Sequence, residues 1–132
     1  MQAATALAPA PGKRLWAGRI VSAVPALFLV LDAAMHIAKP DPVVQAFTQL
    51  GFPLNLAVPL GVTELLLVAL FVVPRTSLLG AILLTGYLGG AVASHVRVGD
   101  PTFQTIFPIL VGALLWGGLF LRDARFGDLV TH

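Results

Sequence analysis

The chain has 132 residues, of which 58% are hydrophobic and 11% charged, with a formal net charge of +2. This balance, together with a mean hydropathy of +0.92, differs from that of soluble domains and is typical of a membrane protein. Eight lysines and arginines are too few for a nucleic-acid surface. The lack of cysteine excludes disulfides, zinc thiolate sites and direct thiol chemistry.

The apolar segments predict four transmembrane helices, because one span needs about 20 largely apolar residues. Residues 1–15 are small and proline-rich and are predicted to form a disordered cytoplasmic tail. Residues 123–132 are predicted to form a second, short cytoplasmic tail. The four spans between the tails are predicted over residues 16–37, 54–73, 78–96 and 102–121.

Residues 43–50 are too short to cross a membrane, and their apolar positions fall on one helical face. They predict a short helix that lies in the membrane interface between the first two spans. The expected fold class is therefore all-α. Residues 16–122 would form one integral membrane domain, a four-transmembrane-helix bundle.

The basic residues predict the orientation of the chain in a bacterial inner membrane. Only two of the eight would lie on the outer side, Lys39 and Arg97. The other six fall at the ends of alternate segments, where they would share the inner side: Lys13, Arg14, Arg19, Arg75, Arg122 and Arg125. Both termini of this multi-pass chain are therefore expected to be cytoplasmic.

Small residues recur in the third and fourth spans. Gly86 and Gly90 have the G-x-x-x-G spacing that lets membrane helices approach closely, and Ala113 and Gly117 repeat it. We interpret both pairs as packing surfaces within one bundle rather than as a dimerisation signal.

Four ionisable residues lie inside segments that are otherwise apolar: Asp32, His36, Glu64 and His95. Each such group costs about 2.5–3.5 kcal/mol at the bilayer centre, so we expect the four to converge. At about 1.5 Å per residue, Asp32, His36 and His95 lie in the outer half of the membrane and Glu64 lies near the midplane. The predicted pocket opens outward and is lined by Phe28, Leu29, Tyr87, Leu88 and Gln104.

The four ionisable residues suggest acid–base chemistry. Asp32 and His36 are four residues apart, so they share a helical face and the carboxylate can orient the imidazole. An apolar span favours the neutral acid form of Glu64, and a neutral acid beside an imidazole suits general acid–base catalysis. The same groups could instead clamp a polar head such as a quinone carbonyl, or simply tie helices together.

Metal and haem sites rank lower as interpretations. The nitrogen and oxygen atoms of the four residues suit a non-haem metal, and His36 and His95 lie at similar depth, as paired haem ligands would. The chain has no E-x-x-H pair and no C-x-x-C-H attachment motif, however. We therefore assign no metal ligand, and no cofactor is evident apart from a quinone as the bound molecule.

Several motifs together resemble the DoxX-like family of small bacterial membrane proteins. They are Leu50-Gly51-Phe52-Pro53 before the second span, Glu64 within it, and Gly86-Tyr87-Leu88-Gly89-Gly90-Ala91 running toward His95, so that the resemblance covers about residues 19–122. It implies a four-helix membrane bundle. It also implies an association with redox enzymes, because founding relatives are subunits of a thiosulfate:quinone oxidoreductase.

This chain departs from the family pattern at the end of the first span. Relatives often carry a small residue and then a lysine there, where Asp32 and His36 add an acid and an imidazole. We predict an acid–base pocket that acts on or binds a lipophilic small molecule, by quinone-linked redox chemistry or by isomerisation or hydration. The alternative is a non-catalytic membrane scaffold or small-molecule carrier. The expected partners are lipid, subunits of a redox enzyme or further copies of this chain.

Overall fold

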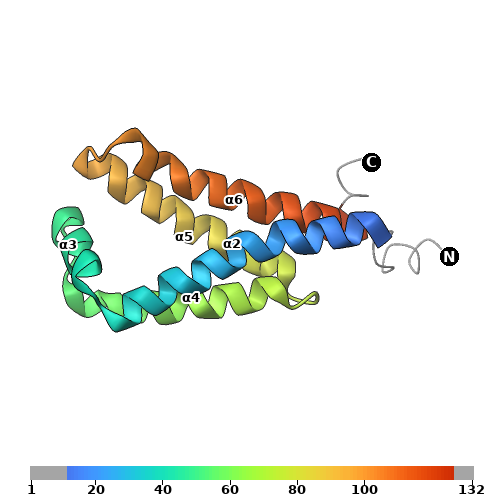
Figure 1. Ribbon diagram of the computed structural model, residues 1–132, viewed down its shortest axis with the longest axis horizontal. Coiled ribbons are helices and arrows are strands. Elements are labelled where there is room, and N and C mark those ends of the chain that lie inside the picture. Colours follow the sequence, from blue (N-terminus) through green and yellow to red (C-terminus); the bar gives the residue numbers. More distant parts are fainter. Residues whose placement is uncertain (1–11, 127–132) are drawn as a thin grey trace.

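The computed structural model describes residues 12–126, and this part of the chain is all-α. Within it, four stretches are long and apolar enough to cross a membrane, as predicted. They comprise α2 (Gly12–Ala38), the turn η1 (Leu54–Leu56) with α4 (Ala57–Val72), α5 (Ser77–Val98) and α6 (Thr102–Arg122). The predicted short helix is also present, as α3 (Asp41–Leu50) (Figure 1).

The helix boundaries follow local chemistry. α2 begins at Gly12, four residues before the predicted start of the first span, while the rest of the predicted N-terminal tail lies outside the described residues, as do residues 127–132. The chain leaves α2 through Lys39, whose φ is 54°, and Pro40 then caps α3. α3 and α5 both end on a left-handed glycine, Gly51 at φ 78° and Gly99 at φ 71°. Glycine adopts this conformation without the steric cost that a Cβ brings.

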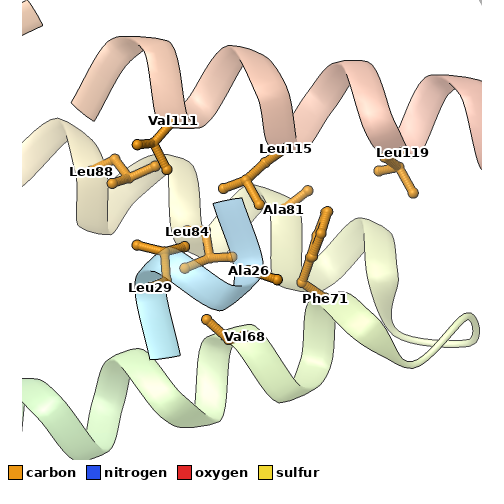
Figure 2. Packing of buried hydrophobic residues seen from close by; sticks show 10 residues of the cluster. All are labelled: Ala26, Leu29, Val68, Phe71, Ala81, Leu84, Leu88, Val111, Leu115 and Leu119. Carbon is orange, nitrogen blue, oxygen red and sulfur yellow. The ribbon is translucent and has the colours of Figure 1, made fainter. Parts of the chain in front are cut away.

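The four long helices pack in a ring. α2 packs against α4 and α6, and α5 packs against the same two helices, so α2 and α5 lie diagonally opposite. Leu29 of α2 and Leu84 of α5 are almost fully buried between them. Figure 2 shows the core, to which every long helix contributes: Ala26, Leu29, Val68, Phe71, Ala81, Leu84, Leu88, Val111, Leu115 and Leu119.

Close helix packing depends on glycines other than the predicted ones. A Cβ at Gly18 would lie 2.5 Å from the backbone nitrogen of Arg122, and one at Gly80 would overlap the backbone of Phe71. At Gly86 and Gly90, by contrast, a Cβ would have no atom within 4 Å. The prediction that these two glycines pack helices within the bundle is therefore wrong, because that face of α5 points outward.

The outer surface of the bundle is apolar. Large side chains on all four long helices are more than half exposed, among them Leu27 at 69%, Leu66 at 61%, Val96 at 61% and Ile109 at 55%. Water would disfavour such a surface, whereas lipid tails would not. The chain is accordingly a multi-pass membrane protein with four candidate spans.

Candidate functional site

Three of the four predicted ionisable residues meet inside the bundle. Asp32 and His36 of α2 and Glu64 of α4 each offer a nitrogen or oxygen atom, and these atoms all lie within 4.8 Å of one another. Tyr87 of α5 reaches the same place, where its hydroxyl donates to Glu64 Oε2 over 3.2 Å. We call these four residues the carboxylate site.

A glycine brings the two main helices of the carboxylate site together. A Cβ at Gly61 would lie 2.8 Å from the carbonyl oxygen of Ala33 and 3.1 Å from Cβ of His36. α4 can therefore approach α2 closely at this point, and Glu64, three residues further along, faces the end of α2. The sequence interpretation missed Gly61. Its signal is a lone glycine one turn before an acid in an apolar helix.

The geometry of His36 fixes the position of its ring proton. Its Nδ1 lies 2.7 Å from the backbone carbonyl oxygen of Asp32, 3.5 Å from Oδ2 of the same residue and 4.0 Å from Oε2 of Glu64. A carbonyl oxygen only accepts hydrogen bonds, so Nδ1 is the donor. Nε2 is then the nitrogen without a hydrogen in the neutral ring. The sequence prediction gave the orienting role to the Asp32 carboxylate, whereas the closer contact is to the Asp32 backbone.

Glu64 is completely buried, and only one of its two carboxylate oxygens has a hydrogen-bond partner among the described residues. Its side chain has 0% exposure, and Oε2 accepts the hydrogen bond from Tyr87. Oε1 is also buried and has no hydrogen-bond partner among residues 12–126. Buried polar atoms are nearly always paired, so one that is left over needs an explanation.

Exposure falls in steps from the surface to the bundle axis. The Asp32 side chain is 39% exposed, His36 18% and Glu64 0%. Phe47 of α3 covers the imidazole edge-on, with 5.6 Å between the ring centroids. Arg97 holds α3 in this position by donating to the Leu50 carbonyl oxygen at its end. The carboxylate site is therefore most exposed at Asp32 among these three residues and has an aromatic cover over His36.

His95 does not join the carboxylate site. Its Nδ1 lies 2.5 Å from Oδ2 of Asp100, which follows the end of α5. The left-handed turn at Gly99 brings this acid back toward the imidazole. Gln104, predicted to line the pocket, is exposed at the start of α6.

The other predicted lining residues lie in different environments. Leu29 and Leu88 belong to the closed core, at 2% and 8% exposure. Phe28 is partly exposed and packs edge-on against Phe107, with centroids 4.9 Å apart. Of the predicted lining, Tyr87 is the residue that contacts an ionisable group of the site.

The carboxylate site has the atoms for two kinds of chemistry. Two carboxyl groups, an imidazole and a phenol can hold a proton and pass it to a bound polar group. The two carboxylates and His36 also form a donor set that suits a divalent ion such as Mn²⁺, Fe²⁺ or Zn²⁺. The predicted haem pair has a weaker basis, because His95 is bonded to Asp100.

Comparison with known proteins places the chain in a family. A family model described as the DoxX-like family matches residues 20–118, which is most of the chain and nearly all of the bundle. The chain therefore belongs to the DoxX-like family, as its motifs predicted. Neither the curated proteins nor the solved structures include a match to it.

Proposed function

We propose that this member of the DoxX-like family binds the polar head of a lipophilic small molecule at the carboxylate site and exchanges a proton with it. The observation that carries the proposal is Glu64, whose Oε1 is buried without a partner among the described residues. A carboxyl group placed this deep in a membrane helix is costly, and such groups typically mark functional sites.

The roles of the residues follow from their contacts. Glu64 and His36 are the proton donor and acceptor, and Tyr87 holds one oxygen of Glu64 so that the other faces the ligand. Asp32 orients His36 and, being more exposed than His36 and Glu64, marks the side from which the head group arrives. His95 takes no part in the transfer, since Asp100 already binds it.

A quinone is the first substrate class for the carboxylate site. Its carbonyl oxygens accept hydrogen bonds from a neutral acid or an imidazolium, and its apolar tail suits entry from the bilayer. Isomerisation or hydration of an apolar substrate would use the same two groups. The family also supports a redox association, with partner subunits as the source or destination of electrons.

Substitution of Glu64 tests the proposal with a defined probe. The full chain is purified in detergent, and its unfolding temperature is measured as decylubiquinone is added. Glu64→Gln should weaken the affinity about tenfold or more, because a hydrogen bond to an ionisable group is lost. His36→Ala should act in the same direction. Asp41→Asn makes the same acid-to-amide change at an exposed position of α3 and should leave binding unchanged.

The outcomes separate the enzyme or binding proposal from its alternative. Folded variants that no longer bind the quinone, and no longer support quinone reduction in host membranes, would support it. Unchanged binding by folded Glu64→Gln would overturn it. Loss of the folded bundle in Glu64→Gln would favour the non-catalytic scaffold or carrier, in which the polar groups only hold helices together.

A divalent metal ion is the second candidate ligand, favoured by the 4.8 Å grouping of Asp32, His36 and Glu64. Elemental analysis of the purified protein distinguishes it from an organic head group. One equivalent of Mn, Fe or Zn that disappears in Asp32→Asn would establish the metal. Much less than one equivalent of metal in both the wild type and Asp32→Asn would favour the organic head group as the ligand.

We also propose that both termini face the cytoplasm. The start of α2 and the end of α6 lie at one end of the bundle (Figure 1). The same end carries Arg19, Arg75 and Arg122. Positive residues favour the cytoplasmic side. The chain has no native cysteine, so single cysteines at positions 41 and 75 can be labelled from outside intact cells. Labelling at 41 alone is expected, and labelling at 75 would reverse the orientation.

A further inference from the structure

A cleft of about 630 Å³ lies at the end of the bundle opposite the carboxylate site. Its walls come from the first turns of α2, the turn between α4 and α5, and the end of α6. Four arginines and one acid line it: Arg19, Arg75, Arg122, Arg125 and Asp123. We call this the arginine cleft, and its lining has a net charge of +3.

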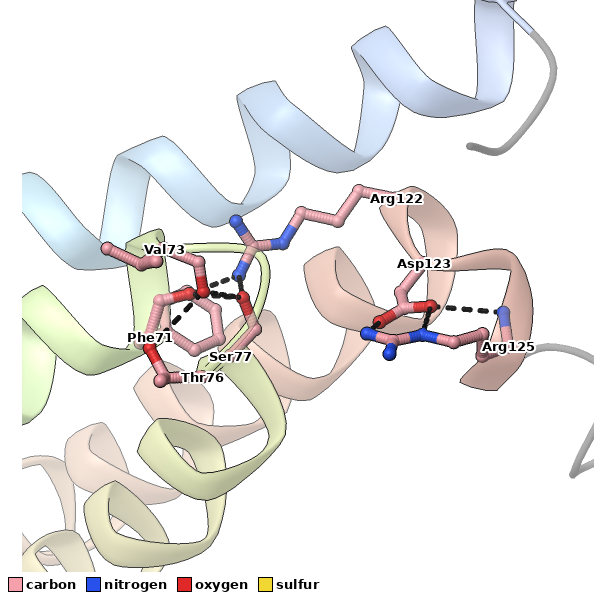
Figure 3. Close-up of polar contacts among 7 residues, drawn as sticks. All are labelled: Phe71, Val73, Thr76, Ser77, Arg122, Asp123 and Arg125. Atoms are coloured by element: carbon pink, nitrogen blue, oxygen red, sulfur yellow. Dashed lines mark hydrogen bonds and ion pairs between the residues drawn. The ribbon is translucent and has the colours of Figure 1, made fainter. Parts of the chain in front are cut away.

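Two of the four arginines are occupied by the protein itself (Figure 3). Arg122 donates to the Phe71 carbonyl oxygen over 2.5 Å and to Ser77 Oγ over 3.1 Å. Arg125 donates to both carboxylate oxygens of Asp123, over 3.1 and 2.9 Å. These contacts leave Asp123 neutralised, so it does not repel an incoming anion.

The other two arginines of the cleft are available. Arg19 is exposed, and its guanidinium stacks over the Trp16 ring at 5.1 Å from the centroid. Arg75 is exposed and forms no hydrogen bond or salt bridge with any residue from 12 to 126. Two guanidinium groups facing one cleft can bind a phosphate through paired hydrogen bonds.

Ser22, which lines this cleft, carries a buried hydroxyl without a partner among the described residues. Ser22 is 3% exposed and lines the cleft, and its Oγ has no hydrogen bond within the described part of the chain. Gly118 of α6 packs directly against it, where a Cβ would overlap. A hydroxyl that is buried and unpaired costs stability, but this one lies against α6, so the arginines are the groups that the cleft offers to a ligand.

We propose that the arginine cleft binds the head group of an anionic phospholipid. The walls beneath the arginines are apolar, formed by Leu15, Val72 and Leu119, as an acyl chain requires. The cleft also lies where the membrane-crossing helices end, at the level of lipid head groups. Basic pockets between helices at this level are known to bind anionic lipid head groups.

Lipid retention tests the proposal with the full chain. The protein is exchanged into detergent that contains either phosphatidylglycerol or phosphatidylcholine, and the retained lipid is counted by native mass spectrometry. Phosphatidylglycerol should be retained and phosphatidylcholine should not. Arg19→Gln and Arg75→Gln should each lower the retention about fivefold. Lys13→Gln removes one charge from the same end of the bundle but does not line the cleft, and it should have no such effect.

Three results would overturn the proposal. Equal retention of the two lipids would show that charge is not recognised. An equal loss in Lys13→Gln would show a diffuse surface effect. Full competition by inorganic phosphate at the same concentration would identify a free anion as the ligand instead of a lipid. Because the readout is lipid retention, it does not depend on quinone binding at the carboxylate site.

Discussion

Two buried polar side chains at opposite ends of the bundle, Ser77 and Glu64, are hydrogen-bonded to different degrees. At the arginine cleft, Ser77 donates to the carbonyl oxygens of Phe71 and Val73, and Arg122 bonds Phe71 and stacks on its ring at 4.5 Å. At the carboxylate site, Glu64 receives one hydrogen bond, and its other oxygen is unpaired among the described residues. Saturated polar contacts serve the fold, whereas an unsaturated buried group is available to a ligand.

The largest expected effect is at the end of the bundle that holds Ser77, in Gly80→Ala. The new Cβ would overlap the backbone of Phe71, which cannot move as a side-chain tip can. We expect a loss of about 3 kcal/mol in the free energy of unfolding, the upper end of the usual range for overpacking, measured by chemical denaturation in detergent. Gly86→Ala adds the same methyl group where nothing lies within 4 Å and should cause no loss. Equal losses in the two variants would contradict the close packing of α4 on α5.

Arg122→Gln should cause the next largest loss in the free energy of unfolding. Two hydrogen bonds from a charged donor are removed, one to the Phe71 carbonyl oxygen and one to Ser77. The expected loss is about 1.5–3 kcal/mol. Arg125→Gln, whose side chain is 46% exposed, should lose at most about 1 kcal/mol. If the two losses were reversed, Arg122 would not be the structural arginine.

Glu64→Gln should change the free energy of unfolding less than Gly80→Ala or Arg122→Gln does. An amide keeps an oxygen that can accept from Tyr87, and its NH₂ group can donate to the Asp32 carboxylate. We expect a change below about 1 kcal/mol, with loss of quinone binding. A destabilisation as large as that of Arg122→Gln would break the comparison, because Glu64 would then also be structural.

The smallest effect is a pH dependence at Asp123. The hydrogen bond from Arg125 lowers the pKa of Asp123 below its ordinary value of 3.8. A lowered pKa in the folded state contributes stability above pH 3.8 that is lost as the pH falls further. The unfolding temperature of the wild type should therefore fall slightly more below pH 4 than that of Asp123→Asn. Arg125→Gln should show the same reduced slope, and an unchanged slope in both variants would exclude this pair as the source.

The sequence predicted the helices well because a transmembrane span is a local property. Run length, proline and the left-handed glycines fix where each helix begins and ends, and the predicted boundaries differ from those observed by at most four residues. Four-residue spacing likewise predicted that Asp32 and His36 would meet, and burial cost predicted a partner for Glu64.

Depth along a span did not predict which way each side chain faces. His95 lies at a depth similar to that of His36, but a turn closes it onto Asp100, five residues away. Tyr87 contacts Glu64 because α5 packs against α4 with this face turned inward, and that arrangement depends on how the helices rotate against each other. The glycine contacts have the same cause, so Gly61 packs closely whereas Gly86 does not.

The ring of helix contacts has a consequence for chain connectivity. The first and last helices, α2 and α6, are neighbours, and Gly18 lies directly against the backbone of Arg122. The start of α2 and the end of α6 lie together at the same end of the bundle as the short α4–α5 turn (Figure 1). A circular permutant that is joined there by a linker and opened at this turn would keep all four helix interfaces, with its new ends on the same side of the membrane. For this fold, the contacts between helices matter more than the order in which the chain visits them.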